Sequence, residues 1–275
     1  MIRDIVVNLP LRAERDRTTA FAASMAGFFN AHLTGIAFVY DPVVACVEFG
    51  AGEARFIEEQ GAEAKKNAQA AIDRLAFEVR REGVPCTSHH IRASIADAPD
   101  QFAEIARGFD ISVVAQNEST ISSLDDLIAE AALFQAGRPV VMVPYVHTAA
   151  FKADRIAIFW DGGAPATRAI NDALPFLNRA RHVDLVSFAG ERELRQELAG
   201  AKMAEHLARH GVAAVVKRVQ TGSDVASAML NYVADTGPDL VVMGGYGHSR
   251  LREFILGGAT RGIMQSMTVP ALMSH

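Results

Sequence analysis

Short apolar runs alternate with long amphipathic segments along the chain. In its second half, runs rich in Val, Ile and Leu predict strands near 155–160, 183–188, 213–219, 239–243 and 269–273. The intervening segments carry apolar residues at three-and-four spacing and few strand formers, which predicts helices over 164–180, 191–210 and 224–236. Strands that alternate with helices are typical of βα units feeding a parallel sheet.

The first half repeats this pattern in the same order. The matched pairs are 3–10 with 154–161, 81–86 with 209–214, 108–120 with 237–249, and 138–145 with 268–275. The first copy is longer in its middle, where 53–83 predicts a long charged amphipathic helix. We therefore predict an α/β protein of two domains, 1–148 and 153–275, each a doubly wound, Rossmann-like sheet of five parallel strands.

The composition argues against a nucleic-acid-binding, membrane-spanning or disulfide-rich protein. The 275 residues are 50% hydrophobic and carry a formal charge of -5, so no overall basic balance favours nucleic acid. No apolar run approaches the roughly 18 residues that a membrane span needs. The cysteines, Cys46 and Cys86, are too few for a disulfide framework, and the first residues do not read as a charged-then-apolar leader. We expect a cytoplasmic protein with neither nucleic acid nor membrane as a partner.

A glycine-rich stretch, GGYGHSRLREFILGG at 244–258, follows the predicted strand at 239–243. Ligands of open parallel sheets bind beyond the carboxyl ends of the strands, so this place favours a site. Glycines let backbone N–H groups approach an anion, and a predicted helix at 259–267 would add its positively polarised start. Loop and helix together predict a phosphate cradle. The alternative is that the glycines only turn the chain tightly.

The spacing excludes several motifs. The glycines fit neither the Walker form, which needs Gly-Lys-Ser/Thr, nor the dinucleotide fingerprint G-x-G-x-x-G. The chain also lacks a nucleophile elbow, a Cys/His pair with a plausible base, and paired carboxylates at a loop. The sequence therefore points to binding more than to catalysis.

The order Gly244-x-x-Gly247, nine residues, then Gly257, set between a DLVVMG strand and a terminal VPALM strand, resembles the universal stress protein family. The duplication resembles the tandem type of that family. The resemblance implies a stress-response protein that binds ATP or a related adenine nucleotide, with Mg²⁺ as a possible companion. It places the glycine motif on the phosphates and a first-strand aspartate near the adenine and ribose.

That aspartate is matched here by Asp161, and Phe188 occupies the place from which a family member contacts the base. The family motif continues with Ser or Thr, and here Gly258 stands instead, so a hydroxyl donor is lost. The implied cofactor-binding positions are Asp161, Phe188, Gly244, Gly247, His248, Gly257, Gly258, Ala259 and Thr260.

The first copy departs further from the motif. Ala115, Gln116, Asn117 and Glu118 stand where the second copy has 244–247, and Pro10 stands in the place of Asp161. We therefore expect one nucleotide site per chain, in the second domain. The first domain would be a structural or regulatory partner.

Local alternatives exist for the polar candidates. Asp161 can instead cap the helix that follows it, and His248 can be an exposed loop residue without a role. The Ser/Thr cluster at 118–123 is a better helix cap than a phosphorylation site.

Three further residues invite a chemical interpretation. His89 and His90 are strand neighbours that point to opposite faces, which favours solvated residues over a shared metal. Cys46 fits a buried apolar residue better than a redox-sensitive thiol.

Two other functional classes stay open. Slow ATP hydrolysis would need a group that positions water and usually a metal-holding carboxylate. A ligand-free interaction scaffold would explain Gly258 and the degenerate first copy. For assembly, the resemblance implies pairing through the last strand, and 138–145 resembles 268–275, so the chain would form its own pseudo-dimer, with a further two-fold dimer as an option.

Overall fold

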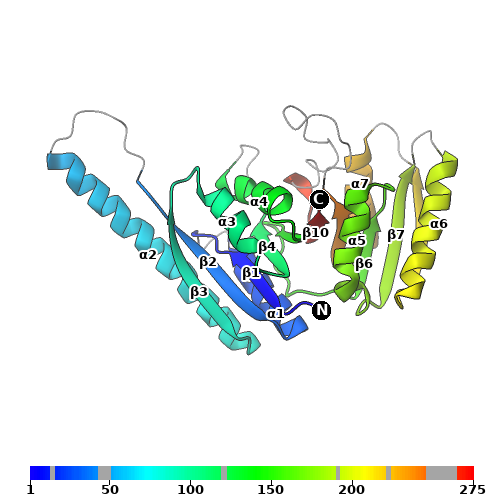
Figure 1. Cartoon of the computed structure of the whole chain (residues 1–275), viewed down its shortest axis with the longest axis horizontal. Coiled ribbons are helices and arrows are strands. Elements are labelled where there is room, and N and C mark those ends of the chain that lie inside the picture. The colour runs from blue at the N-terminus through cyan, green and yellow to red at the C-terminus, as the bar shows by residue number, and fades with distance from the viewer. Residues whose placement is uncertain (13–15, 43–50, 119–122, 190–192, 221–223, 246–264) are drawn as a thin grey trace.

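The computed structural model describes residues 1–12, 16–42, 51–118, 123–189, 193–220, 224–245 and 265–275 (Figure 1). The first half contains β1 (Asp4–Asn8), α1 (Thr18–Phe29), β2 (His32–Tyr40), α2 (Ala51–Glu82), β3 (Cys86–Ala93), α3 (Ala98–Ala106), β4 (Ile111–Ala115), α4 (Leu124–Gln135) and β5 (Val140–Val143). The second half contains β6 (Arg155–Phe159), α5 (Ala164–Leu177), β7 (His182–Ala189), α6 (Glu193–Arg209), β8 (Ala214–Gln220), α7 (Val225–Thr236), β9 (Leu240–Gly244) and β10 (Ala271–Ser274). The strands predicted for the second half, and the helices predicted between its first four strands, are all present.

The described strands form one ten-stranded sheet in the order β3-β2-β1-β4-β5-β10-β9-β6-β7-β8. Each half has the same internal order, and all its strand pairs are parallel. The halves join where β5 and β10 pair antiparallel, with Val141 opposite Leu272. The predicted pairing of 138–145 with 268–275 is therefore confirmed, and it occurs within the chain.

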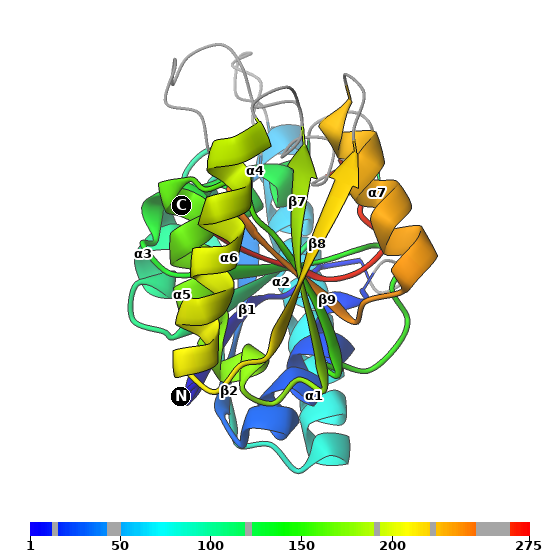
Figure 2. The ribbon, with the colours of Figure 1, turned by 90° about the vertical axis from the view of Figure 1, so that its right-hand side faces the viewer.

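Helices cover both faces of the sheet. Residues of α1, α2, α5 and α6 share one hydrophobic core with one face, and residues of α3, α4 and α7 share another core with the opposite face. Figure 2 shows α6 and α7 on opposite sides of β7 and β8. This is the doubly wound arrangement that right-handed βα crossovers produce, so the predicted fold class is confirmed.

An aspartate repeats with the fold. The Asp110 carboxylate accepts hydrogen bonds from the N–H groups of Arg3 (2.7 Å) and Asp4 (3.1 Å), at the amino end of β1. In the second half, the Asp239 carboxylate accepts from the N–H of Arg155 (2.9 Å), at the amino end of β6. The two aspartates occupy matched places in the sequence repeat, so the repeat carries over to individual hydrogen bonds.

The segment between β5 and β6 ties the halves together. The ring of Phe151 makes edge contacts with Phe21 of α1 and Phe176 of α5, at centroid distances of 5.5 Å and 5.9 Å. The Phe151 N–H donates to the hydroxyl of Ser24 (3.1 Å). After α5, the guanidinium of Arg179 lies 4.9 Å from the centroids of two phenylalanine rings of α1. The connecting segment is therefore part of a core that both halves share.

The structure tests those of the remaining local predictions that fall on described residues. Ser123 is the N-cap of α4, and its N–H donates to Asp126 (2.9 Å) in a capping box, so the capping interpretation of 118–123 is confirmed. His89 and His90 are exposed on β3, as predicted, and the described residues contain no cluster that would hold a metal ion. Cys46 lies outside the described residues. Of the helices in the described ranges, none has the length and apolarity to cross a membrane.

Candidate functional site

Three strands of the second half end at one edge of the sheet. Phe159 of β6 stands opposite Val186 of β7 and Met243 of β9. Asp161 lies two residues beyond Phe159, Gly244 lies one residue beyond Met243, and Phe188 lies two residues beyond Val186. All three residues therefore lie near the same edge of the sheet. The fold thus brings together those predicted contact residues that the structure describes.

Gly244 touches the start of α5. A Cβ atom at this position would lie 2.4 Å from the backbone nitrogen of Ala166 and 2.7 Å from the carbonyl carbon of Pro165. Such distances leave no room for a side chain, so glycine is required for the close approach of β9 to the helix. The start of α5, with its positively polarised end, consequently lies beside the carboxyl end of β9.

Asp161 has a local structural role. Its Oδ1 atom accepts a hydrogen bond from the N–H of Gly163 (2.8 Å), the N-cap residue of α5. The carboxylate therefore fixes the turn that leads into the helix, without capping the N–H groups of the first helical turn itself. The side chain is exposed, and among the described residues its Oδ2 atom has no hydrogen-bond partner. Helix initiation and ligand binding are thus compatible roles for this residue.

The side chain of Phe188 is half-buried on the α7 side of the sheet. Its ring packs edge-on against Phe159 at 5.1 Å between centroids and against Tyr232 of α7 at 6.5 Å. These rings hold the predicted base-contacting residue in one orientation.

Trp160 is a neighbour of the site that the sequence reasoning missed. It directly precedes Asp161, is 8% exposed, and its indole nitrogen has no hydrogen-bond partner among the described residues. A buried N–H without a partner is uncommon in folded proteins. The available signal was that the single tryptophan of the chain adjoins the predicted ligand aspartate.

Gly245 connects the site to the first half of the chain. Its N–H donates to the carbonyl of Ser274 (2.8 Å), and a Cβ atom here would lie 2.8 Å from Cδ2 of Leu133 in α4. The second residue of the glycine-rich stretch is thus held between the last strand and the first half of the chain.

The other predicted contact residues, Gly247, His248, Gly257, Gly258, Ala259 and Thr260, lie outside the described residues. Most of the predicted last helix, 259–267, lies there as well.

In the first half, the place that corresponds to Asp161 is taken by Pro10. Its carbonyl oxygen accepts a hydrogen bond from the guanidinium of Arg74, which reaches it from α2. The same guanidinium pairs with Asp16 at 3.0 Å. At the matched end of β4, the N–H of Gln116 donates to the carbonyl of Val143 (2.8 Å), continuing the sheet ladder.

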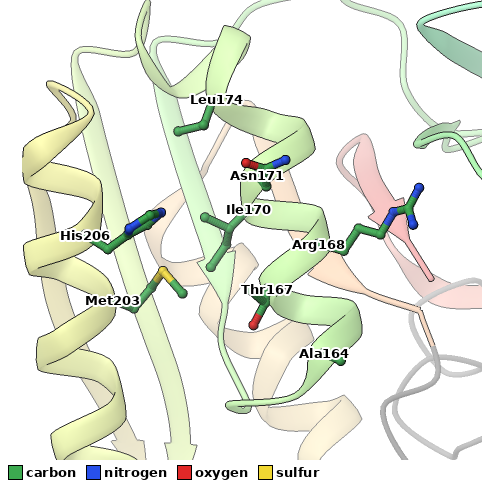
Figure 3. Close-up of a pocket in the computed structure, with 8 residues that line it drawn as sticks. All are labelled: Ala164, Thr167, Arg168, Ile170, Asn171, Leu174, Met203 and His206. Atoms are coloured by element: carbon green, nitrogen blue, oxygen red, sulfur yellow. The ribbon is translucent and has the colours of Figure 1, made fainter.

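A groove separates α5 from α6 (Figure 3). Ile170 and Leu174 of α5 face Met203 and His206 of α6 across it. Arg168, the permanently charged residue of the lining, points away and donates to the carbonyl of Gly137 (2.7 Å). The lining therefore fits apolar groups better than phosphate, and the edge around Asp161 and Gly244 remains the better nucleotide candidate.

The comparisons with known proteins agree with this architecture. Residues 154–275 match the family model of the universal stress protein family. No curated protein matches the chain significantly.

Among solved structures, a universal stress protein from Archaeoglobus fulgidus DSM 4304 is similar over 98% of this chain and 97% of its own, with a TM-score of 0.73 and 13% identity. A putative universal stress protein from Pseudomonas aeruginosa UCBPP-PA14 is similar over 99% of this chain and 93% of its own, with a TM-score of 0.63 and 16% identity. The cytoplasmic domain of a prokaryotic cation chloride cotransporter shares the fold at a TM-score of 0.53 and 11% identity, over 100% of this chain and 96% of its own. At these identities the structures support the fold over the whole length, while the family model assigns the second half. The second half of the chain, residues 154–275, therefore matches the universal stress protein family, and the whole chain shares its fold with solved universal stress proteins.

Proposed function

We propose that the chain is a tandem universal stress protein that binds ATP or a related adenine nucleotide, with or without Mg²⁺, in its second half. The observation that carries the proposal is the contact of Gly244 with the start of α5, next to the exposed Asp161. This contact joins the beginning of the glycine-rich stretch to a helix start, and both features favour anions.

The described residues suit the remaining parts of a nucleotide. Asp161 keeps Oδ2 open toward a ribose hydroxyl or adenine amine while Oδ1 holds the turn. Phe188 offers a ring edge on the α7 side of the sheet. In this arrangement the stretch 244–260 holds the phosphates, with backbone N–H groups at Gly258 and Ala259 in place of the missing hydroxyl.

Binding would act on the first half through the loop. Gly245 lies between Ser274 and Leu133, so a nucleotide bound by 244–260 changes the surface on which α4 rests. This makes the nucleotide a regulator of how the two halves meet a partner protein. Hydrogen exchange tests the step, because ATP is expected to slow exchange across 244–260, and unchanged exchange would contradict it.

The first half is proposed to bind no nucleotide. Pro10 replaces the aspartate, and the Arg74 guanidinium occupies the adjoining polar position through its bonds to Pro10 and Asp16. A stoichiometry of one nucleotide per chain is therefore expected.

Isothermal titration of nucleotide-free protein with ATP and Mg²⁺ tests the proposal directly. Saturation is expected near one site per chain, and Asp161→Ala and Gly247→Val are expected to abolish it. Asp235→Ala is the matched control, because it removes an exposed carboxylate on α7, away from the sheet edge. The fluorescence of Trp160 gives a second readout, since its indole adjoins the site.

The outcomes separate the other functional classes. No heat, no thermal shift and no fluorescence change would contradict the proposal and leave a ligand-free scaffold. Phosphate release that disappears in Gly247→Val would add slow hydrolysis to binding.

A further inference from the structure

Helix α2 is much longer than its counterpart in the second half. It spans 32 residues, whereas α6 spans 17, although each follows the second strand of its half and covers the same face of the sheet. The buried residues of α2 begin at Ala68 and continue through Ala71, Leu75 and Val79. Before Ala68 no described side chain of the helix is buried, and Figure 1 shows this part of α2 extending past the sheet. We call residues 51–67 the α2 arm, which is roughly 25 Å long at 1.5 Å per residue.

The face of α2 that packs on the rest of the protein continues along the arm, where it has no partner among the residues that the structure describes. The buried residues Ala68, Ala71 and Leu75 follow a three-and-four spacing, and the same spacing leads outward through Ala64, Gly61 and Ile57. These outer three are half-buried, while the described residues between them are exposed. A Cβ atom at Gly61 would have nothing within 4 Å, so the face is open there.

A glycine in the middle of such a helix needs a reason. Gly61 disfavours the helix by about 1 kcal/mol relative to alanine, and helices without tertiary packing are marginal in water. A second helix that crosses closely at Gly61 would supply both the packing and the reason for a missing side chain.

The charged residues beside this face would match those of a second, identical arm. When two arms run antiparallel with Gly61 opposite Ala64, Ile57 lies opposite Ala68. Glu58 and Lys65 then flank the face on the same edge and stand opposite each other, once in each direction. Both are exposed, and neither forms an ion pair with a described residue. The other edge brings Gln60 opposite Asn67, so both edges match in one register.

We propose that the α2 arm pairs antiparallel with the α2 arm of a second copy of this chain, which makes a two-fold dimer. The interface is isologous, because each arm presents the same face and the same Glu58 and Lys65 to its partner. The dimer does not depend on nucleotide, since the arm lies in the half that lacks the glycine motif.

Sedimentation velocity of the full chain over a wide concentration range tests the proposal. The natural sequence is expected to show a concentration-dependent dimer. Glu58→Lys or Lys65→Glu alone places like charges opposite each other and is expected to weaken the dimer by about tenfold or more. The double variant Glu58→Lys, Lys65→Glu restores opposite charges and is expected to restore the dimer. Glu63→Lys makes the same change of charge away from the contact face and serves as the control.

Circular dichroism establishes that each variant keeps its helices, which exposed substitutions are expected to preserve. A natural sequence that stays monomeric at every concentration would overturn the proposal. A dimer that survives both single reversals unchanged would also overturn it, because the interface would then lie elsewhere.

Discussion

The backbone of Gly244 lies directly against the backbone nitrogen of Ala166, so that the end of β9 and the start of α5 meet without an intervening side chain. This contact determines where the glycine-rich stretch leaves the sheet, and it can be tested without any ligand.

We predict that Gly244→Ala destabilises the protein by about 1–3 kcal/mol, because the new methyl group overpacks a backbone contact. Urea denaturation followed by circular dichroism measures the change. Gly108→Ala is the control, since a Cβ there meets its nearest atom at an ordinary 3.5 Å. Equal stability of the natural sequence and Gly244→Ala would show that α5 can shift to make room.

Phe151→Ala is expected to cost about 3–5 kcal/mol, since it removes a buried ring from the core that α1 and α5 share. Calorimetry should then show the halves unfolding in separate steps instead of one. Phe77→Ala removes a ring that is 65% exposed and should change stability by less than about 0.5 kcal/mol. A single unshifted transition for Phe151→Ala would mean that the β5–β10 pairing alone couples the halves.

Mild acid should weaken the same junction through His147. Burial lowers the pKa of its imidazole below the ordinary value of 6.5, and its ring lies edge-on to Phe21. Protonation therefore favours the unfolded chain, so the stabilisation is complete above pH 6.5 and is lost as the pH falls below it. Urea midpoints measured from pH 7.5 downward should decline less in His147→Gln than in the natural sequence. The exposed His90→Gln is the control, and an equal decline in both variants would assign the effect to other groups.

Tyr232→Phe should destabilise the second half by about 1.5–3 kcal/mol. The Tyr232 hydroxyl donates to the buried carboxylate of Asp184 (2.9 Å), which also contacts the His182 ring (3.1 Å), and phenylalanine leaves one carboxylate oxygen without this donor. Burial and the neighbouring Asp184 raise the pKa of Tyr232, so the phenol stays protonated well into alkaline solution. Chemical denaturation at neutral pH provides the measurement, with the exposed Tyr145→Phe beside it. A loss no larger than that of Tyr145→Phe would show that water replaces the hydroxyl.

Periodicity predicted the elements because each strand and helix has its apolar pattern within a few consecutive residues. The likeness of 138–145 to 268–275, together with the family resemblance, likewise predicted that these two runs pair, and the structure shows the pairing of β5 with β10 to be antiparallel. Contacts between distant residues left no such local pattern. Three features depend on packing across the sheet: the position of Phe151 between α1 and α5, the Gly245–Leu133 contact, and the Trp160 indole, which has no hydrogen-bond partner among the described residues.

The sequence likewise predicted only part of the candidate site. The sequence identified Asp161, Phe188 and Gly244, and the register of β6, β7 and β9 brings them to one edge. It left open whether Asp161 serves the helix or a ligand, because both roles use a carboxylate before a helix start. It also linked Gly244 to an anion, whereas the structure shows its nearest neighbour to be the backbone of α5.

The antiparallel pairing of β5 with β10 has an evolutionary consequence. In a dimer of identical subunits every mutation appears twice, so a change that harms one copy harms the other as well. Here the paired halves share one polypeptide and mutate independently. One half can exchange its aspartate for Pro10 and lengthen α2 while the other retains Asp161 and its glycines, and the sheet that joins them stays intact.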